Sequence, residues 1–369
     1  MKAIVSKTDL RDAIARIMPA VAVKPATPVL AGIYLQADAH SSLTLRATNF
    51  ELDITAKIPA NVEAEGTTVA TGKLFSQIVN KLGGEIITLV DADNQLAIRS
   101  EAASFDILTM DAGDFPAPLK IDDEISFNMN KNALKNLIRR TTFAVGKDTT
   151  RPIFLGVNFA IEGTQLTAVG TNASRIAIVK DKIYDERSAN VIIPAASLRA
   201  LQSALDVEDN IAVALNKHHA AFKFDNIRFV TRLIDGTFPP FKSVIPATCA
   251  TTAEVDTKDL LAAIDRIQII SAEDHDKTVM MKFTGDGLEL SASSYSVGKA
   301  IEHVDADVTG SDLALGMNYQ FLIDGLKIFD SQKIQIGMNE KLTPVMFTGK
   351  DDPDFIYIAT PLRTRAGAD

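Results

Sequence analysis

The sequence repeats itself with a long period, and this repeat limits the possible folds more than any other feature of the chain. Residues 48–54 (TNFELDI) have a counterpart 123 positions later in residues 171–177 (TNASRIA). The turn at residues 113–116 (GDFP) returns at residues 236–239 (GTFP), again 123 positions later. Three copies of this length account for the 369 residues, and such a copy is too long for a solenoid unit but suits an independent domain.

Each copy follows the same plan. An amphipathic helix opens it, because apolar residues recur at helical spacing from Leu10, from Leu134 and from Leu260. Segments with alternating apolar and polar residues follow, such as residues 43–47 and 288–292, and these predict half-buried strands. A second amphipathic helix and further strands complete the copy. The six expected helices span residues 7–18, 73–82, 131–141, 195–205, 257–267 and 318–328.

Two helices can cover only one face of so many strands, and this gives the fold class. We expect an α+β fold made of three tandem copies of a domain in which two helices pack on curved antiparallel sheets. The expected domains are residues 1–121, 122–248 and 249–364, and residues 365–369 are expected to form a disordered tail.

Charge is distributed unevenly along the chain. The net charge of −9 would argue against a nucleic-acid partner if it were spread evenly. The six helix windows, however, hold 13 Lys or Arg and 5 Asp or Glu, an excess of eight positive charges, which leaves −17 for the rest. If the helices share one concave face, that face would attract duplex phosphates without reading base sequence. The alternative interpretation is an ordinary solvated helix surface.

No sequence pattern of catalysis or of metal binding is present. The chain lacks a Gly-rich phosphate loop, a Walker-type lysine and an HExxH motif, so we expect no enzyme activity, no cofactor and no metal. Charged residues near the start exclude a signal peptide, no apolar run suits a membrane, and the lone Cys249 fits a reducing compartment. We therefore expect a cytoplasmic protein without a membrane partner. Two other classes stay open: a hydrolase built on tandem domains, and a scaffold that binds proteins but no DNA.

Three local signatures carry a family resemblance. Residues 24–33 (KPATPVLAGI), 235–241 (DGTFPPF) and 360–364 (TPLRT), in this order along three repeats, resemble the bacterial DNA polymerase III beta subunit family, the DNA sliding clamps. The resemblance covers the whole chain and implies the DNA clamp fold, with helices lining the inside of a ring. It also implies a head-to-tail homodimer that encircles double-stranded DNA. Such a processivity factor tethers the replicative DNA polymerase, the clamp loader and other proteins that carry a short clamp-binding peptide.

The resemblance implies a cleft and an interface, and together with the basic helices it gives a set of DNA-binding residues. The expected peptide-binding cleft comprises Phe154, Thr171, Ala173, Arg175, Ile176, Pro239, Val244, Asn318, Phe321, Ile358, Thr360, Pro361, Leu362 and Arg363. The expected DNA-binding residues are Lys24, Lys73, Lys81, Lys135, Arg139, Arg140, Lys147, Arg151 and Arg199. The expected dimer interface contains Lys73, Phe105, Ile269 and Ile270.

Four positions in or beside the expected cleft depart from the family pattern. Ser174 stands where many clamps have a histidine, and Ser243 where an arginine is common. Phe154 replaces a smaller aliphatic residue, and Phe321 replaces a tyrosine. These differences bear on which peptide the cleft prefers.

Overall fold

The computed structural model describes residues 1–101, 103–119, 121, 125–205, 210–272 and 277–363, so the expected tail lies outside the described residues. The chain divides into two compact units. The first comprises Met1–Lys135, Ile183–Arg187 and Ala196–Leu233, and the second comprises Asn136–Lys182, Ser188–Ala195 and Ile234–Asp369. The division passes through the second of the three repeats.

Each repeat contains two α-helices, as the sequence predicts. They are α1 (Lys7–Ile17), α2 (Gly72–Lys81), α3 (Lys131–Thr142), α4 (Ala195–Ala204), α5 (Thr257–Ser271) and α6 (Tyr319–Leu326). Polar side chains cap the first turns: Ser6 accepts a hydrogen bond from the amide of Asp9, and Asp256 accepts from the amides of the first turn of α5. Helix α5 continues four residues past its predicted end, to the buried Ser271. Helix α6 is shorter than predicted, and Asn318 is its N-cap.

The strands of the first unit form one antiparallel sheet. They are β1 (Lys2–Ser6), β2 (Gly32–Asp38), β3 (Ser42–Thr48), β4 (Leu52–Pro59), β5 (Asn61–Ala64), β6 (Gly66–Thr71), β7 (Ile86–Ala92), β8 (Gln95–Ser100), β9 (Ala103–Met110), β10 (Ile125–Asn130), β13 (Asn210–Leu215), β14 (His219–Phe224) and β15 (Ile227–Arg232). Within the described residues their order is β10-β13-β14-β15-β4-β3-β2-β6-β9-β8-β7-β1-β5. Strand β15 of the second repeat pairs with β4 of the first, with Ile227 opposite Ala56 and Thr231 opposite Leu52.

The second unit contains a similar join, that is, a strand of one repeat that pairs with a strand of the repeat before it. Its strands are β11 (Gly156–Thr171), β12 (Arg175–Pro194), β16 (Thr251–Asp256), β17 (Thr278–Thr284), β18 (Gly287–Ser294), β19 (Gly298–Val304), β20 (Ala306–Thr309), β21 (Leu313–Asn318), β22 (Lys333–Met338), β23 (Val345–Gly349) and β24 (Asp352–Ala359). In the described part of the chain, one sheet has the order β11-β12-β24-β23-β22-β16-β20 and the other β19-β18-β17-β21. Strand β24 of the third repeat pairs with β12 of the second, with Ile358 opposite Ile176.

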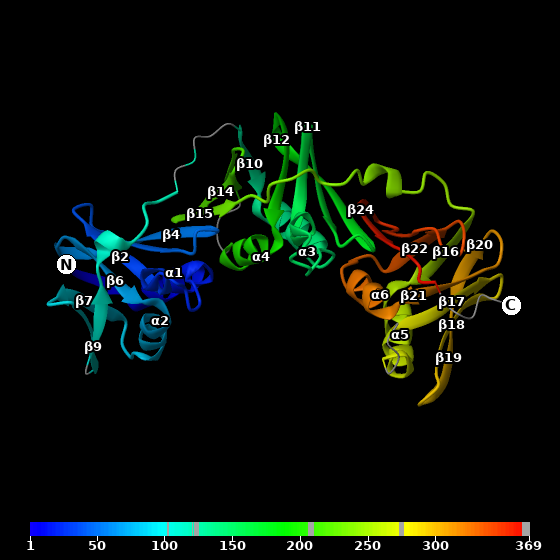
Figure 1. The fold of residues 1–369 in the computed structure, drawn as a ribbon, viewed down its shortest axis with the longest axis horizontal. Coiled ribbons are helices and arrows are strands. Elements are labelled where there is room, and N and C mark those ends of the chain that lie inside the picture. Colours follow the sequence, from blue (N-terminus) through cyan, green and yellow to red (C-terminus); the bar gives the residue numbers. More distant parts are fainter. Residues whose placement is uncertain (102, 120, 122–124, 206–209, 273–276, 364–369) are drawn as a thin grey trace. The chain divides into compact units, whose positions relative to one another are not determined.

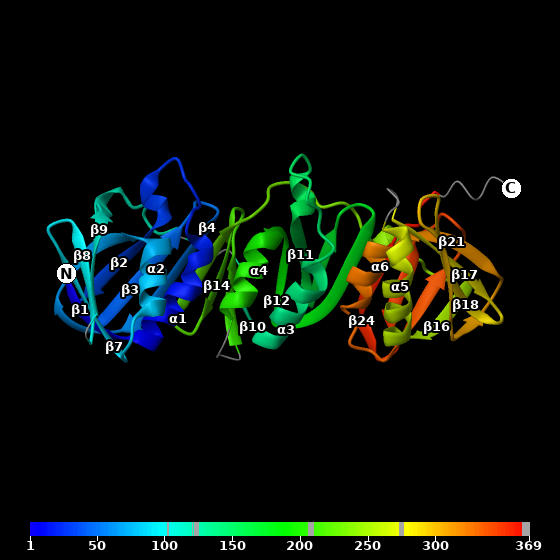
Figure 2. The same ribbon diagram turned by 90° about the horizontal axis from the view of Figure 1, so that it is seen from below.

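The apolar helix positions named from the sequence lie in the core. Leu10 on α1 and Leu260 on α5 are fully buried, as is Leu134 on α3. Helices α1 and α2 pack against each other on the sheet of the first unit, and α5 and α6 pack against each other in the second (Figure 1, Figure 2). Each buried leucine stabilises the fold by roughly 1.5–3 kcal/mol. The α+β fold class is confirmed.

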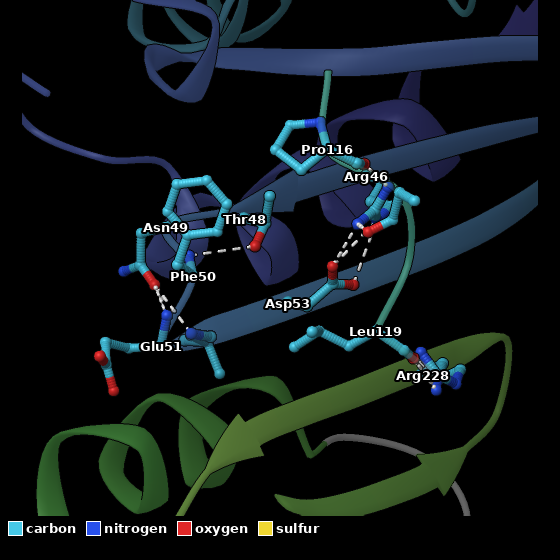
Figure 3. A network of polar contacts seen from close by, with 11 residues as sticks. Arg46, Thr48, Asn49, Phe50, Glu51, Asp53, Pro116, Leu119 and Arg228 are labelled. Carbon is cyan, nitrogen blue, oxygen red and sulfur yellow. Dashed lines mark hydrogen bonds and ion pairs between the residues drawn. The ribbon is translucent and has the colours of Figure 1, made fainter. Parts of the chain in front are cut away.

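A buried ion pair fastens the segment that leaves the first repeat. Arg46 on β3 and Asp53 on β4 face each other, with 2.5 Å between Nη2 and Oδ2 (Figure 3). Arg46 also donates hydrogen bonds to the carbonyl oxygens of Pro116 (2.6 Å) and Ala117 (2.8 Å). Its guanidinium therefore ties this segment to the sheet, and its bonds to Asp53 offset the cost of burying both charges.

Candidate functional site

An apolar hollow of about 220 Å³ lies in the second unit. Three stretches of chain form it: the turn between β11 and β12, the segment after β15, and the end of β24. Phe154 adds an aromatic wall from a short 3-10 helix, Pro152–Leu155. The lining residues are Phe154, Thr171, Ala173, Ser174, Arg175, Ile176, Phe238, Pro239, Pro240, Phe241, Val244, Ile358 and Thr360.

The turn between β11 and β12 is fixed by its own polar side chains. Asn172 Oδ1 accepts hydrogen bonds from the amides of Ser174 (3.0 Å) and Arg175 (2.9 Å). Thr171 Oγ1 donates to the carbonyl of Arg175 (2.6 Å) and accepts from the amide of Ala173 (3.1 Å). Ala173 is held in the left-handed region, at φ 75°. Ala173 is one of the residues that line the hollow.

The floor of the hollow is a packed apolar cluster. Val169, Ile176 and Ile358 are buried in it beside Phe238. Pairing of β12 with β24 places Ile176 directly opposite Ile358, so strands of two consecutive repeats supply the floor. An apolar floor of this kind offers a desolvated pocket for leucine-like or phenylalanine-like side chains.

Arg175 is the charged residue of the hollow, and it is buried and tightly held. Its Nη1 lies 2.7 Å from Oδ2 of Asp324, and its Nη2 donates to the carbonyl of Phe143 at 2.6 Å. The guanidinium stacks over the rings of Phe321 (4.7 Å) and Phe143 (5.5 Å). Its Nε has no hydrogen-bond partner among the described residues. Arg175 therefore contributes a buried, tightly held guanidinium to the wall of an apolar hollow.

Tyr357 braces helix α6 behind the hollow. Its hydroxyl donates to the carbonyl of Phe321 at 2.9 Å. Burial raises the pKa of Tyr357 far above its ordinary value, so the phenol stays neutral and remains a donor at physiological pH. This bond holds Phe321 under Arg175.

The structure brings most of the expected cleft residues together. Those that line the hollow are Phe154, Thr171, Ala173, Arg175, Ile176, Pro239, Val244, Ile358 and Thr360. Asn318 instead caps α6, where its Oδ1 accepts from the amides of the first turn, and Phe321 lies behind Arg175. Pro361, Leu362 and Arg363 follow Thr360 beyond the lining, and Leu362 bonds through its amide to the carbonyl of Gly316. The role of these residues in binding a partner stays a prediction.

Four lining residues were absent from the predicted set. Phe238, Pro240 and Phe241 belong to the FPPF run, whose repeat relationship to the first copy was a signal that could have identified them. Ser174 lines the hollow beside them, and its carbonyl accepts a hydrogen bond from the amide of Thr360 at 2.9 Å.

The basic residues expected to face DNA are mostly accessible. Lys73 and Lys81 are exposed on α2, Lys135 is half-buried on α3, and Arg199 is exposed on α4. The remaining exposed loop residues are Lys24, Lys147 and Arg151.

Arg139 and Arg140 differ from these residues because they contact acidic side chains. Arg140 is only 7% exposed, and its Nη1 lies 2.5 Å from Oδ2 of Asp352 while its Nη2 lies 3.0 Å from Oδ2 of Asp330. Arg139 also bonds to Asp330 and donates to the carbonyl of Ile328 at 3.1 Å. The structure thus places Arg140 away from solvent, where it would have to leave two carboxylates to meet a phosphate.

The residues expected at a dimer interface lie on open faces. Phe105 on β9 is 42% exposed and Ile269 on α5 is 69% exposed, both high values for large apolar side chains. Ile270 is half-buried next to Ile269. Their place at a dimer interface stays a prediction.

Chemistry-bearing groups are sparse elsewhere. Among the described residues, no group of three or more His, Cys, Asp or Glu side chains is placed to hold a metal ion. Burial raises the pKa of the Cys249 thiol, which keeps the thiol protonated at neutral pH. None of the helices in the described ranges is long and apolar enough to cross a membrane.

The matches to known proteins extend over nearly the whole chain. Residues 1–119, 128–240 and 242–363 match the family models of the N-terminal, central and C-terminal domains of the DNA polymerase III beta subunit. The beta sliding clamp of Bacillus subtilis (strain 168) is 30% identical over 379 residues, covering 99% of this chain and 100% of that protein. The beta sliding clamp of Halalkalibacterium halodurans is 32% identical over 361 residues, covering 94% and 95%. The crystal structure of the DNA polymerase sliding clamp from Bacillus subtilis matches with a TM-score of 0.95 at 28% identity, over 99% of both chains.

Proposed function

The chain belongs to the DNA polymerase III beta subunit family, and from this membership we propose how its surfaces serve the function of a sliding clamp. It is a DNA sliding clamp, a processivity factor without catalytic activity of its own. The two other classes considered from the sequence, a hydrolase and a scaffold that does not bind DNA, have no support among the family matches. The clamp works as a homodimer on double-stranded DNA with the replicative polymerase, its loader and other clamp-binding proteins.

The proposed DNA-facing residues are the accessible basic ones. They are Lys24, Lys73, Lys81, Lys135, Arg139, Lys147, Arg151 and Arg199. Lysine and arginine contacts to phosphates give affinity without base recognition, which a protein that slides along DNA requires. Arg140 is left out of this surface because of its burial against Asp330 and Asp352.

The proposed partner site is the hollow around Arg175. Its apolar floor suits leucine and phenylalanine anchors of a short linear peptide, and the buried guanidinium of Arg175 forms part of its wall. The observation that carries this proposal is the convergence of Phe154, Val244 and Ile358, from three separate stretches of chain, on one apolar hollow beside Arg175. We keep Asn318, Phe321, Pro361, Leu362 and Arg363 as the proposed outer part of the site.

The proposed domain limits are residues 1–121, 122–248 and 249–364, and the two joins β4–β15 and β12–β24 support them. Each join adds a strand of one repeat to the sheet of the repeat before it. We propose that the clamp acts in the cytoplasm, where the bacterial chromosome is replicated.

Fluorescence polarisation with a labelled Gln-Leu-x-Leu-Phe-type peptide tests the partner site. The substitution Val244→Glu places a charge at the hollow on a side chain that is 38% exposed, so the fold should tolerate it. We expect the peptide Kd to rise at least about tenfold, because an unpaired carboxylate in an apolar pocket loses its hydration.

The matched control is Leu342→Glu, because Leu342 is 52% exposed and lies outside the hollow. This variant should bind like the unaltered chain. Equal affinities of Val244→Glu and Leu342→Glu, or no saturable binding by the folded unaltered chain, would contradict the proposed partner site.

A further inference from the structure

Three arginines occupy the same place in the three repeats. Arg16 lies in the last turn of α1, Arg140 follows it by 124 residues on α3, and Arg266 follows by another 126 on α5. The same two steps separate the buried helix residues Leu10, Leu134 and Leu260, so the three arginines are repeat-equivalent.

The first two arginines use the same atom for the same contact. Arg16 Nη1 lies 3.3 Å from Oδ2 of Asp225, in the turn that precedes β15. Arg140 Nη1 lies 2.5 Å from Oδ2 of Asp352, which begins β24. Strands β15 and β24 are those that join the sheet of the preceding repeat at β4 and β12. Each arginine therefore ties its own repeat to the strand that the next repeat contributes.

Arg266 is the equivalent arginine of the third repeat, but it does not make the contact that Arg16 and Arg140 make. Its Nε and Nη2 bond to Glu302 on β19, and its Nη1 forms no hydrogen bond or ion pair with a described residue. Strand β19 is the counterpart of β4 and β12, because Ala56, Val179 and Glu302 follow one another at steps of 123 residues. In the described part of the chain β19 is an edge strand. Its outer edge is thus open where β4 and β12 each receive a strand.

The first repeat contains the strand and the acid that would fit there. Strand β9 is the counterpart of β15, and Glu101 begins the turn before it as Asp225 begins the turn before β15. Both residues have left-handed backbones, at φ 44° for Glu101 and 46° for Asp225. Within the described residues, strand β9 pairs with β6 only through Thr109 and Met110, and β8 covers its other edge. Most of β9 therefore has one unpaired edge.

We propose that Nη1 of Arg266 binds the carboxylate of Glu101 in a second copy of this chain, so that the third ion pair of the series forms between subunits. The inference rests on the proposed homodimer. The register follows from the first join, where Ile227 after the turn pairs with Ala56. The equivalent pair is Ala103 of the second copy opposite Glu302, which brings Glu101 next to Arg266. Arg266 then bridges two carboxylates, as Arg140 bridges Asp330 and Asp352.

Charge reversal tests this pair. We expect Glu101→Arg and Arg266→Glu each to weaken the dimer at least about tenfold, since the contact occurs twice per ring and reversal puts like charges together. The double variant should return to within about threefold of the unaltered chain, because the reversed pair can form. Sedimentation velocity over a dilution series measures the dimer Kd of each full-length protein, and circular dichroism checks folding.

Asp93→Arg is the matched control, because Asp93 is an exposed acid in the neighbouring turn between β7 and β8 and also has a positive φ, 52°. It should leave the dimer Kd within about twofold. Additive losses in the double variant, or single variants no weaker than Asp93→Arg, would overturn the proposed pair. A monomeric unaltered chain at micromolar concentration would instead contradict the homodimer on which the inference rests.

Discussion

At the scale of single residues, equivalent positions of consecutive repeats perform different tasks. Arg46 and Asp53 form a buried ion pair in the first repeat, whereas Val169 and Ile176, 123 positions later, form part of the apolar floor of the hollow. The ion pair holds the segment after the first repeat against the sheet. The apolar pair leaves the second repeat with a floor that suits apolar anchors.

We predict that Arg46→Met destabilises the first unit by about 3–5 kcal/mol, because Asp53 is fully buried and would lose its partner. The double variant Arg46→Val with Asp53→Ile, which copies the second repeat, should recover at least about half of that loss. Hydrogen bonds to Pro116 and Ala117 would still be missing. Urea unfolding followed by circular dichroism measures these differences.

Arg99→Met is the control for this prediction, because Arg99 forms an exposed ion pair with Asp106 on the same sheet. It should cost less than about 1 kcal/mol. If Arg46→Met cost no more than Arg99→Met, the buried pair would not be holding the segment.

At the scale of elements, periodicity predicted the helices because each buries one apolar face, as Leu10 and Leu260 show. The ends were less predictable. Helix α6 begins after Asn318, which the sequence window counted as helical although its side chain caps the helix. The partners of Arg140 could not be predicted, since Asp330 and Asp352 lie about 190 and 212 residues away along the chain. A basic helix surface and a buried ion-pair residue look alike in sequence.

Ion pairs with Asp330 attach α3 to the segment after α6, and they predict that the stability of the fold depends on pH. Burial would raise the pKa of Asp330, but the hydrogen bonds and charges of Arg139 and Arg140 outweigh it and lower that pKa below 3.8. A lowered folded-state pKa stabilises the fold above the ordinary pKa, and this contribution disappears as pH falls through the lowered value. Since the Asp330 side chain is mostly exposed, solvent screening limits this contribution to the stability of the fold to about 1 kcal/mol.

The urea midpoint of Asp330→Asn should therefore lie below that of the unaltered chain at pH 7 and approach it as pH falls toward 3. Asp312→Asn, which changes an exposed acid of the same unit, should show no such pH-dependent difference. A gap that stays constant from pH 7 to pH 3 would count against the ion pair.

At the scale of the whole molecule, the long repeat period of the sequence predicted most of the fold. It identified repeats that each hold two helices, and the strand joins β4–β15 and β12–β24 follow the same period. The repeat period could not predict the hollow, because the lining of the hollow combines the turn at Ala173, the FPPF segment and the end of β24. Those segments meet only after strands of consecutive repeats have paired.

The central claim is that this chain is held on DNA by topology, as a closed ring, rather than by electrostatic affinity alone. The most direct measurement is retention on nicked circular duplex DNA after loading by a clamp loader, before and after one cut that makes the circle linear. We predict that the protein stays on the circle when salt is raised and leaves once the circle is cut, because a ring slides off a free end. Equal loss from the circular and the linear form as salt rises would indicate ordinary phosphate binding and would contradict the account.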